Sequence, residues 1–242
     1  HMDWAGVRYG ILNQAHCYGE LNEYLSQCAR KYPSRFVGTA QVIELDSDKD
    51  KEIDKLRHAI NVLGLKALYY TIDPVDLGGQ LRFDQDRFSP FWNEVSHLKA
   101  PVIWDIGNEK EDYLEKLKML ERVMKRYDIR GVLSHFAASP DKPPRILLSI
   151  LRHPNAWLGL DRVLKRSHVE EYPYPSIQKM TEFMYRAIGA DRMLWGSDLP
   201  AIFRACTYQQ SLNLLKNQCP FFSEEERKLI LGENARRLFD LP

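Results

Sequence analysis

The chain has 242 residues, of which 44% are apolar and 28% are charged, a composition that excludes a disordered or fibrous protein. Its formal net charge is +1, so no field of one sign is expected to attract nucleic acid or anionic lipid. No apolar run is long enough to span a bilayer, and we therefore expect neither a nucleic-acid nor a membrane partner.

The cysteines, Cys17, Cys28, Cys206 and Cys219, form no C-x-x-C pair, so a zinc site built on cysteines is not expected. Free thiols in a reducing, cytoplasmic setting are the simplest interpretation, and a disulfide between two of them is the alternative. No secretion signal is visible, and the leading His1 is interpreted as a remnant of an expression vector.

Short apolar segments alternate with longer amphipathic segments, and the two kinds predict strands and helices respectively. In chain order, the predicted strands are 7–13, 36–43, 65–72, 101–106, 130–135, 156–160 and 192–195. The predicted helices are 21–31, 50–63, 90–98, 112–127, 146–151, 177–188, 208–217 and 223–239. The last helix opens with Ser223 and has Glu226 three residues later, which is the pattern of a capping box.

Strict alternation of strands and helices predicts parallel strands joined by right-handed crossovers. We predict a single domain, 1–242, with an α/β fold of the (β/α)8 TIM-barrel type. Only seven strands are visible where a closed barrel needs eight, and residues 3–7 resemble the end of a helix that leads into a strand. The barrel is therefore expected to be incomplete at its N-terminus. A doubly wound open sheet is the alternative, but no G-x-G-x-x-G motif supports a dinucleotide-binding version.

A seven-stranded barrel would leave two strand edges with unpaired backbone groups. We expect a partner chain, a loop or a local rearrangement to fill the gap, so a homodimer is one predicted outcome.

Ionisable side chains recur where four consecutive predicted strands end. They are Asp105, His135, Asp161 and Asp198. In a parallel barrel the active site lies at the carboxyl ends of the strands, so this recurrence predicts a site there. Each residue also has a structural interpretation: Asp198 can cap a turn, His135 can be a core histidine, and the other two can form ion pairs or helix caps.

Four segments resemble the amidohydrolase-related (amidohydrolase 2) family of metal-dependent TIM-barrel hydrolases and decarboxylases. Residues 193–200 (MLWGSDLP) look like the last barrel strand of that family, and 231–239 (LGENARRLF) look like its terminal helix. Residues 32–38 look like its helix-to-strand junction, and 130–135 (RGVLSH) look like the strand that carries its histidine. The resemblance extends over nearly the whole chain.

The resemblance implies roles for individual residues. Asp198 matches the last-strand aspartate, a metal ligand that helps to activate bound water, and His135 matches the histidine that polarises or protonates substrate. Where the family has a further metal-binding histidine, this chain has Asp105, which becomes a candidate ligand. The resemblance implies a first strand with a metal-binding His-x-His or Glu-x-His pair, and no such strand is visible before Asp3. His16, just past the first predicted strand, is a candidate that could compensate in part, and the alternative is a loop histidine without a ligand role.

The implied activity is that of a hydrolase or non-oxidative decarboxylase that uses a divalent metal, zinc or manganese. Its substrate would be a small carboxylate-bearing molecule, a lactone or an amide. Trp104 and Asp161 at strand ends, and Arg82 in the loop 73–86, are candidate substrate-binding residues. The alternative is a catalytically impaired or truncated barrel that holds no metal and serves as a binding protein.

Overall fold

The computed structural model describes residues 1–14, 18–72, 81–107, 112–139, 141–161 and 170–241. The chain divides into two compact units. Unit 1 contains residues 1–7 and 133–240, and unit 2 contains residues 8–132 and the last two residues of the chain. The prediction of a single domain stays a prediction.

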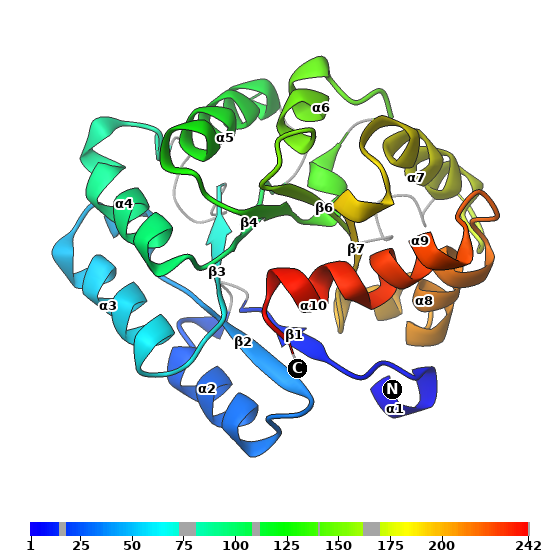
Figure 1. The fold of residues 1–242 in the computed structure, drawn as a ribbon, viewed down its shortest axis with the longest axis horizontal. Helices are drawn as coiled ribbons and strands as arrows, with labels where there is room; N and C mark the ends of the chain where they lie inside the picture. Colours follow the sequence, from blue (N-terminus) through cyan, green and yellow to red (C-terminus); the bar gives the residue numbers. More distant parts are fainter. Residues whose placement is uncertain (15–17, 73–80, 108–111, 140, 162–169, 242) are drawn as a thin grey trace. The chain divides into compact units, whose positions relative to one another are not determined.

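Unit 2 is built on parallel strands that are neighbours in chain order. They are β1 (Gly10–Leu12), β2 (Phe36–Ala40), β3 (Ala67–Thr71) and β4 (Val102–Asp105). The helices between and after them are α2 (Asn22–Lys31), α3 (Asp50–Asn61), α4 (Ser89–Leu98) and α5 (Tyr113–Tyr127), with short 3-10 turns η2 (Glu44–Asp46) and η3 (Asp86–Phe88). The helices of this unit all lie on the same side of its strands (Figure 1). A further short strand, β5 (Gly131–Leu133), runs across the boundary between the units.

An aromatic cluster fills the space between the strands and helices of unit 2. Its members are Tyr70, Phe83, Phe91, Trp92 and Trp104, all with no exposed surface. The ring centroids of Trp92 and Trp104 are 5.4 Å apart, and the indole nitrogen of Trp92 donates to the Phe83 carbonyl at 2.7 Å. Such rings bury a large apolar area in one place, which anchors β3 and β4 to the helical layer.

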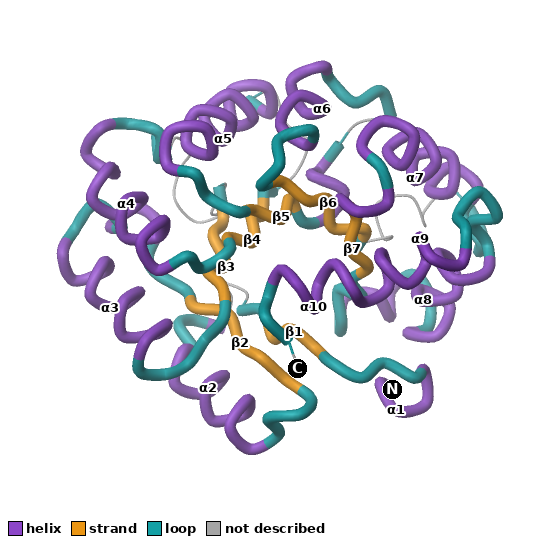
Figure 2. The backbone as a smooth tube through the Cα atoms, viewed as in Figure 1, coloured by secondary structure: helices purple, strands orange, loops and turns teal. Residues whose placement is uncertain are grey.

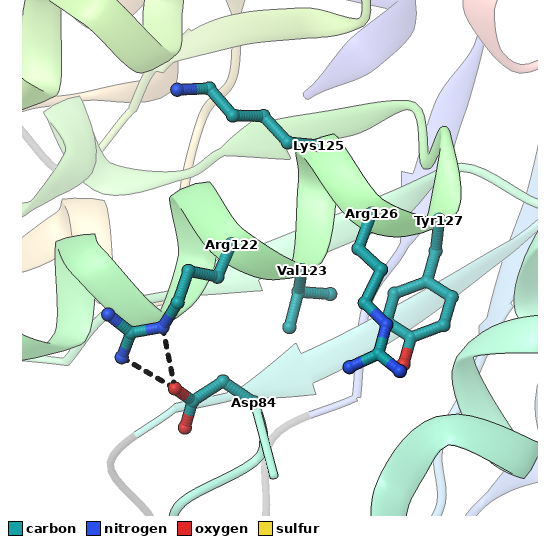
Figure 3. Close-up of a pocket in the computed structure, with 6 residues that line it drawn as sticks. All are labelled: Asp84, Arg122, Val123, Lys125, Arg126 and Tyr127. Atoms are coloured by element: carbon teal, nitrogen blue, oxygen red, sulfur yellow. Dashed lines mark hydrogen bonds and ion pairs between the residues drawn. The ribbon is translucent and has the colours of Figure 1, made fainter. Parts of the chain in front are cut away.

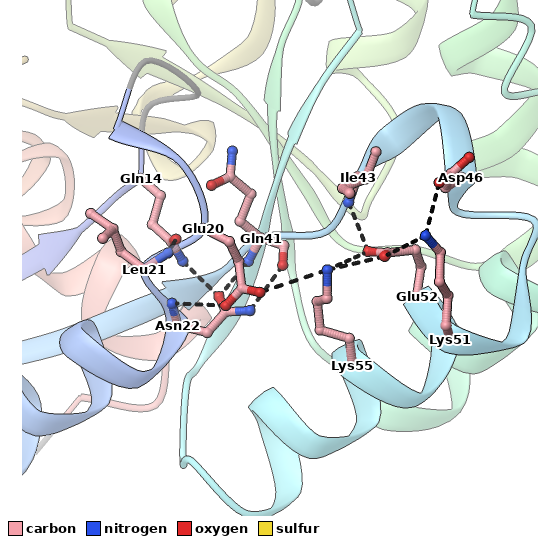
Figure 4. Close-up of polar contacts among 10 residues, drawn as sticks. All are labelled: Gln14, Glu20, Leu21, Asn22, Gln41, Ile43, Asp46, Lys51, Glu52 and Lys55. Carbon is pink, nitrogen blue, oxygen red and sulfur yellow. Dashed lines mark hydrogen bonds and ion pairs between the residues drawn. The ribbon is translucent and has the colours of Figure 1, made fainter.

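A buried polar network ties the ends of β1 and β2 to helix α2 (Figure 4). Gln14 Nε2 donates to Asn22 Oδ1 at 2.7 Å, and the backbone nitrogen of Leu21 donates to Gln14 Oε1 at 2.6 Å. Asn22 Oδ1 also accepts from the backbone nitrogen of Gln41 at 2.8 Å. Because each of these buried groups has hydrogen-bond partners, the network holds the ends of β1 and β2 in place beside helix α2 without a loss of folding stability.

Unit 1 contains the parallel neighbours β6 (Ala156–Leu160) and β7 (Met193–Trp195), with Leu160 opposite Trp195 (Figure 2). Its α-helices are α1 (Met2–Ala5), α6 (Arg145–Leu151), α7 (Pro175–Ile188), α8 (Tyr208–Asn217), α9 (Glu224–Lys228) and α10 (Asn234–Leu238). Its 3-10 turns are η4 (His135–Ala138), η6 (Ala190–Arg192) and η7 (Ala201–Arg204).

The last helical segment of unit 1 is interrupted by a π-helical stretch, η8 (Leu229–Glu233), between α9 and α10. Its start is the predicted capping box, in which Ser223 and Glu226 each bond the other's backbone nitrogen. Directly after the π-helical stretch, the Asn234 amide donates to the carbonyls of Ala190 and Met193 at 2.8 and 2.9 Å. This one side chain therefore fixes the helix to the start of β7.

The predicted α/β class and the alternation of elements are confirmed, with shorter strands than the sequence predicted. The predicted strand 130–135 ends at Leu133, because the backbone turns into a left-handed conformation from His135 onwards. Among the described residues, no helix is long and apolar enough to cross a membrane. Cys28, Cys206 and Cys219 are free thiols, and Cys17 lies outside the described residues.

Candidate active site

The carboxyl ends of the strands of unit 1 carry three of the predicted site residues. Asp161 directly follows β6, and Asp198 lies three residues beyond β7. His135 opens η4, which contacts β6. Since β6 and β7 are parallel neighbours, their carboxyl ends lie at the same edge.

His135 and Asp161 form a close pair at this edge. The Nδ1 atom of His135 lies 2.7 Å from Asp161 Oδ2, and the His135 backbone nitrogen donates to Asp161 Oδ1 at 2.7 Å. The two side chains are only 11% and 14% exposed. Both carboxylate oxygens therefore contact one residue, which fixes the ring orientation and directs Nδ1 toward Asp161.

The pair changes the acidity of the carboxyl group. Burial alone would raise the pKa of Asp161, but the charge and the hydrogen bonds of His135 outweigh burial and lower that pKa. Asp161 is therefore a carboxylate near neutral pH, and this favours a proton on the facing imidazole nitrogen.

The backbone around His135 is strained. Residues 135–138 have φ angles of 57°, 53°, 55° and 49°, although none of them is glycine. A left-handed conformation costs roughly 1–2 kcal/mol for each such residue. Asp198 also has a left-handed φ, of 51°. Strain of this kind persists where the surrounding structure enforces it, and it is concentrated at functional sites in proteins.

An apolar cluster supports the strained turn from one side. Tyr174, Ile177, Ile202 and Leu214 form its buried part, and Phe136, Tyr172 and Cys206 pack against it. Burial raises the pKa of the Cys206 thiol to about 11, so this thiol stays protonated at neutral pH. A protonated, half-buried thiol is a poor nucleophile. The candidates for acid-base chemistry at this edge are therefore His135, Asp161 and Asp198.

Asp198 is placed by the turn after β7. Its backbone carbonyl accepts from Ile202 at 3.0 Å, and the preceding Ser197 hydroxyl accepts from the backbone nitrogen of Leu199 at 3.3 Å. These bonds begin the short η7 turn, so the residue has the turn-forming role expected of a Gly-Ser-Asp segment. The prediction that His135 and Asp198 serve one substrate stays a prediction.

The remaining predicted site residues belong to unit 2 or lie outside the described part. Asp105 accepts from the Tyr69 hydroxyl at 2.8 Å and from the Gly107 backbone nitrogen at 2.9 Å. Trp104 is fully buried in the aromatic cluster, and the Arg82 side chain is 47% exposed, with Nε 3.5 Å from Asp84. His16 and residues 73–80 of the predicted substrate loop lie outside the described residues.

A hollow of about 400 Å³ on unit 2 has a different character (Figure 3). It is lined by Asp84, Arg122, Val123, Lys125, Arg126 and Tyr127. Arg122 binds Asp84 at 2.5 Å, Arg126 binds Asp86 at 2.7 Å, and Lys125 points away from the other side chains. Because exposed ion pairs already satisfy these cations, we assign no active site to this hollow.

The donor groups of the described residues do not assemble a complete metal site. In the described part of the chain, no group of three or more histidine, cysteine, aspartate or glutamate side chains is close enough to hold a metal ion. In unit 1, both Asp161 oxygens already contact His135, and in unit 2 both Asp105 oxygens accept hydrogen bonds. These oxygens would have to give up their present contacts before they could bind a metal ion.

Comparisons with known proteins identify the architecture. A family model described as amidohydrolase matches residues 1–241. The chain is similar to 2,6-dihydroxybenzoate decarboxylase from Rhizobium, with 19% identity, a TM-score of 0.76 and coverage of 99% of this chain and 86% of that one. It is also similar to a probable 2-pyrone-4,6-dicarboxylic acid hydrolase from Acinetobacter baumannii with citric acid bound, at 20% identity, a TM-score of 0.74 and the same coverage.

A third similar structure is a dihydroxybenzoic acid decarboxylase from a Polaromonas species, with bound manganese and the inhibitor 2-nitroresorcinol. It shares 19% identity and a TM-score of 0.65, and the match covers 91% of this chain and 74% of that one. No curated protein matches the chain. At these identities the structures show the fold, which confirms the predicted TIM-barrel type.

The structure adds features that the sequence analysis missed. The left-handed turn at residues 135–138 has little signal in the sequence, because His135 alone is of a residue type enriched in that conformation. Asp161, a predicted substrate-binding residue, contacts His135 instead, and no local pattern in the sequence predicts this contact.

Proposed function

Since the chain belongs to the amidohydrolase family that its residues 1–241 match, we propose that it is a hydrolase or non-oxidative decarboxylase of small carboxylate-bearing or lactone substrates. The observation that carries this proposal is the pair of His135 and Asp161, held at a strand end by a strained turn. Similar structures include decarboxylases of dihydroxybenzoates and a probable hydrolase of a pyrone dicarboxylate, so both reaction classes have precedents in this fold.

The two reactions make the same demand on the protein. Decarboxylation replaces a carbon–carbon bond with a carbon–hydrogen bond, so an acid must supply a proton to the carbon. Lactone hydrolysis removes a proton from water and delivers one to the leaving oxygen. In our proposal, Asp161 holds Nδ1 of His135, and Nε2 exchanges the proton with the substrate.

Asp198 has the second role in this proposal. Its carboxylate would act as the base that accepts a proton from water in hydrolysis, or as a ligand for a divalent cation. Arg82 belongs to unit 2, where its side chain is 47% exposed, and its contact with a substrate carboxylate stays a prediction. Trp104 has the least support as a substrate contact, because it is fully buried.

The test is a substrate panel with the purified chain, in the absence and presence of added manganese or zinc. Release of carbon dioxide from 2,6-dihydroxybenzoate and ring opening of 2-pyrone-4,6-dicarboxylate are measured separately. We expect turnover of one of the two, and a loss of about 100-fold or more in His135→Gln. Turnover that survives this substitution, or no turnover of either substrate, would contradict the proposal.

A second candidate is a barrel that binds small carboxylates without a metal. It is favoured by the carboxylate oxygens of Asp105 and Asp161, which already have partners within the protein. Elemental analysis after incubation with manganese or zinc and removal of excess metal separates the candidates. About one ion per chain, with less in Asp198→Asn, supports the metal-dependent enzyme. A metal-free chain that binds 2,6-dihydroxybenzoate in calorimetry without turnover supports the second candidate.

A further inference from the structure

Asp161, the residue directly after β6, lies against Gly159, a residue of that strand that has no side chain. A Cβ atom added to Gly159 would lie 2.8 Å from Asp161 Oδ1, 3.2 Å from the Ser134 Cα and 3.4 Å from the Leu133 carbonyl oxygen. Gly159 and Asp161 are two residues apart, so they face the same side of β6. The oxygen that a methyl group would displace is the one that accepts from the His135 backbone nitrogen.

A second glycine contacts the same aspartate from the neighbouring segment. A Cβ atom added to Gly196 would lie 2.9 Å from Asp161 Cβ and 3.5 Å from Asp161 Cγ. In the register of β6 and β7, Leu160 is opposite Trp195, so Asp161 and Gly196 are each one residue further along their segments. Because Asp161 Cβ is attached directly to the backbone, it cannot yield by a rotamer change.

Neither glycine has the left-handed backbone that would otherwise explain its presence. What the two positions share is a close approach to one carboxyl-bearing side chain, and such an approach is a common reason for glycine in a strand. At Gly196 all three contacts are with the Asp161 side chain, and at Gly159 the shortest is with Asp161 while the backbone of Ser134 and Leu133 follows at 3.2 and 3.4 Å.

We propose that Gly159 and Gly196 are positioning residues that form a slot for the Asp161 side chain and thereby set its carboxylate against His135. The proposal rests on the proposed function for its catalytic consequence, but the geometry of the slot can be tested without any substrate. A methyl group at either position pushes the carboxylate away from Nδ1 and the backbone nitrogen of His135.

The experiment compares Gly159→Ala and Gly196→Ala with the matched control Gly232→Ala. Gly232 belongs to the same unit, and a Cβ atom there would meet nothing within 4 Å. The first readout is the Nδ1 proton resonance of His135 in 15N-histidine-labelled protein, assigned by its loss in His135→Gln. We expect this resonance to shift or disappear in the two slot variants and in Asp161→Asn, and to stay in Gly232→Ala. A resonance unchanged in both slot variants overturns the proposal.

The second readout is turnover of the substrate identified with the panel. Misplacement of a catalytic group by about 1 Å can cost on the order of 100-fold in rate, so we expect a fall in kcat in both slot variants with KM changed little. If the resonance is lost but turnover persists, the slot stands and the role of His135 in the proposed function fails. If the resonance and kcat are both unchanged, the slot itself is wrong.

A variant that fails to fold is also informative. Asp161→Gly removes the Cβ atom that Gly196→Ala would strike. If Gly196→Ala is unfolded and the double variant folds as Asp161→Gly does, the conflict is with Asp161 and the proposal is supported. If the double variant is also unfolded while Asp161→Gly folds, the conflict lies elsewhere and the proposal is overturned.

Discussion

Asp105 in unit 2 and Asp161 in unit 1 occupy equivalent places at the ends of their strands, yet they have different partners. Asp105 accepts from the Tyr69 hydroxyl and from the backbone of Gly107 in its own loop. Asp161 accepts from the backbone of His135 and faces its imidazole. A phenol and a loop amide hold a carboxylate in place, whereas an imidazole beside a carboxylate can also transfer protons. The strand-end position alone therefore does not identify an active site.

The backbone also differs between the strand end of Asp161 and His135 and the strand end of Asp105. The residues that follow β5 into the His135 turn are left-handed at four successive positions, whereas Gly107 after β4 is a glycine with a φ of 79°. Glycine adopts this conformation without steric cost. Gly107 thus has its left-handed conformation without strain, and the turn of His135 is maintained against strain.

The largest effect is expected from Asp161→Asn, which removes the charge that faces His135. We expect the free energy of unfolding to fall by about 1.5–3 kcal/mol at pH 7, because a hydrogen bond to a charged group is lost. The pKa of Asp161 is lowered in the folded protein, so its contribution is complete above the ordinary aspartate value and is lost as the pH falls through the folded pKa.

Urea unfolding at several pH values between neutral and acidic measures this dependence. The difference between the native protein and the variant should shrink as the solution becomes acidic. A constant difference would mean that the carboxylate charge does not stabilise this turn.

A smaller effect is expected in unit 2 from Tyr69→Phe, which removes the hydroxyl donor to Asp105 and keeps the ring. The predicted loss of unfolding free energy is about 0.5–1.5 kcal/mol, the usual net value of one hydrogen bond. Turnover of Tyr69→Phe should also be measured. A loss of activity as large as that of His135→Gln would show that Asp105 takes part in catalysis as well.

The smallest effect is expected from Ala137→Gly in the strained turn. Relief of the left-handed conformation offsets the flexibility that glycine adds to the unfolded chain, so the unfolding free energy should change by less than about 0.5 kcal/mol. Ala59→Gly in α3 is the matched control, because Ala59 is equally buried. Glycine within a regular helix should cost roughly 1 kcal/mol there. Equal losses at both positions would indicate that the turn is not strained.

The sequence was most informative where a regular period or a local motif determines the structure. Apolar residues such as Leu56 recur at helical spacing and are buried in α3, and the capping box at Ser223 has both of its predicted bonds. The polar residues at strand ends could be predicted for the same reason, because the alternation of strands and helices indicates where each strand ends.

The rest depends on contacts between distant segments. The His135 turn is left-handed at four positions, although the histidine alone in His-Phe-Ala-Ala is of a residue type enriched in that conformation. Packing of Phe136 against Tyr174 and its neighbours contributes to the support of this turn, and no local rule contains such information. The approach of Gly196 to Asp161 likewise requires the registration of β6 and β7.

The π-helical stretch Leu229–Glu233 has a consequence for sequence variation at this end of the chain. A π-turn holds more residues than an α-turn, so removal of one residue from the stretch would let an ordinary α-helix continue. The α-turn with one residue fewer fills the same single turn, so the residues on either side would keep their faces of the helix. Asn234 would still face Ala190 and Met193, so a one-residue deletion within this stretch should be tolerated, whereas a deletion elsewhere in the same helix would rotate Asn234 by about 100° away from them.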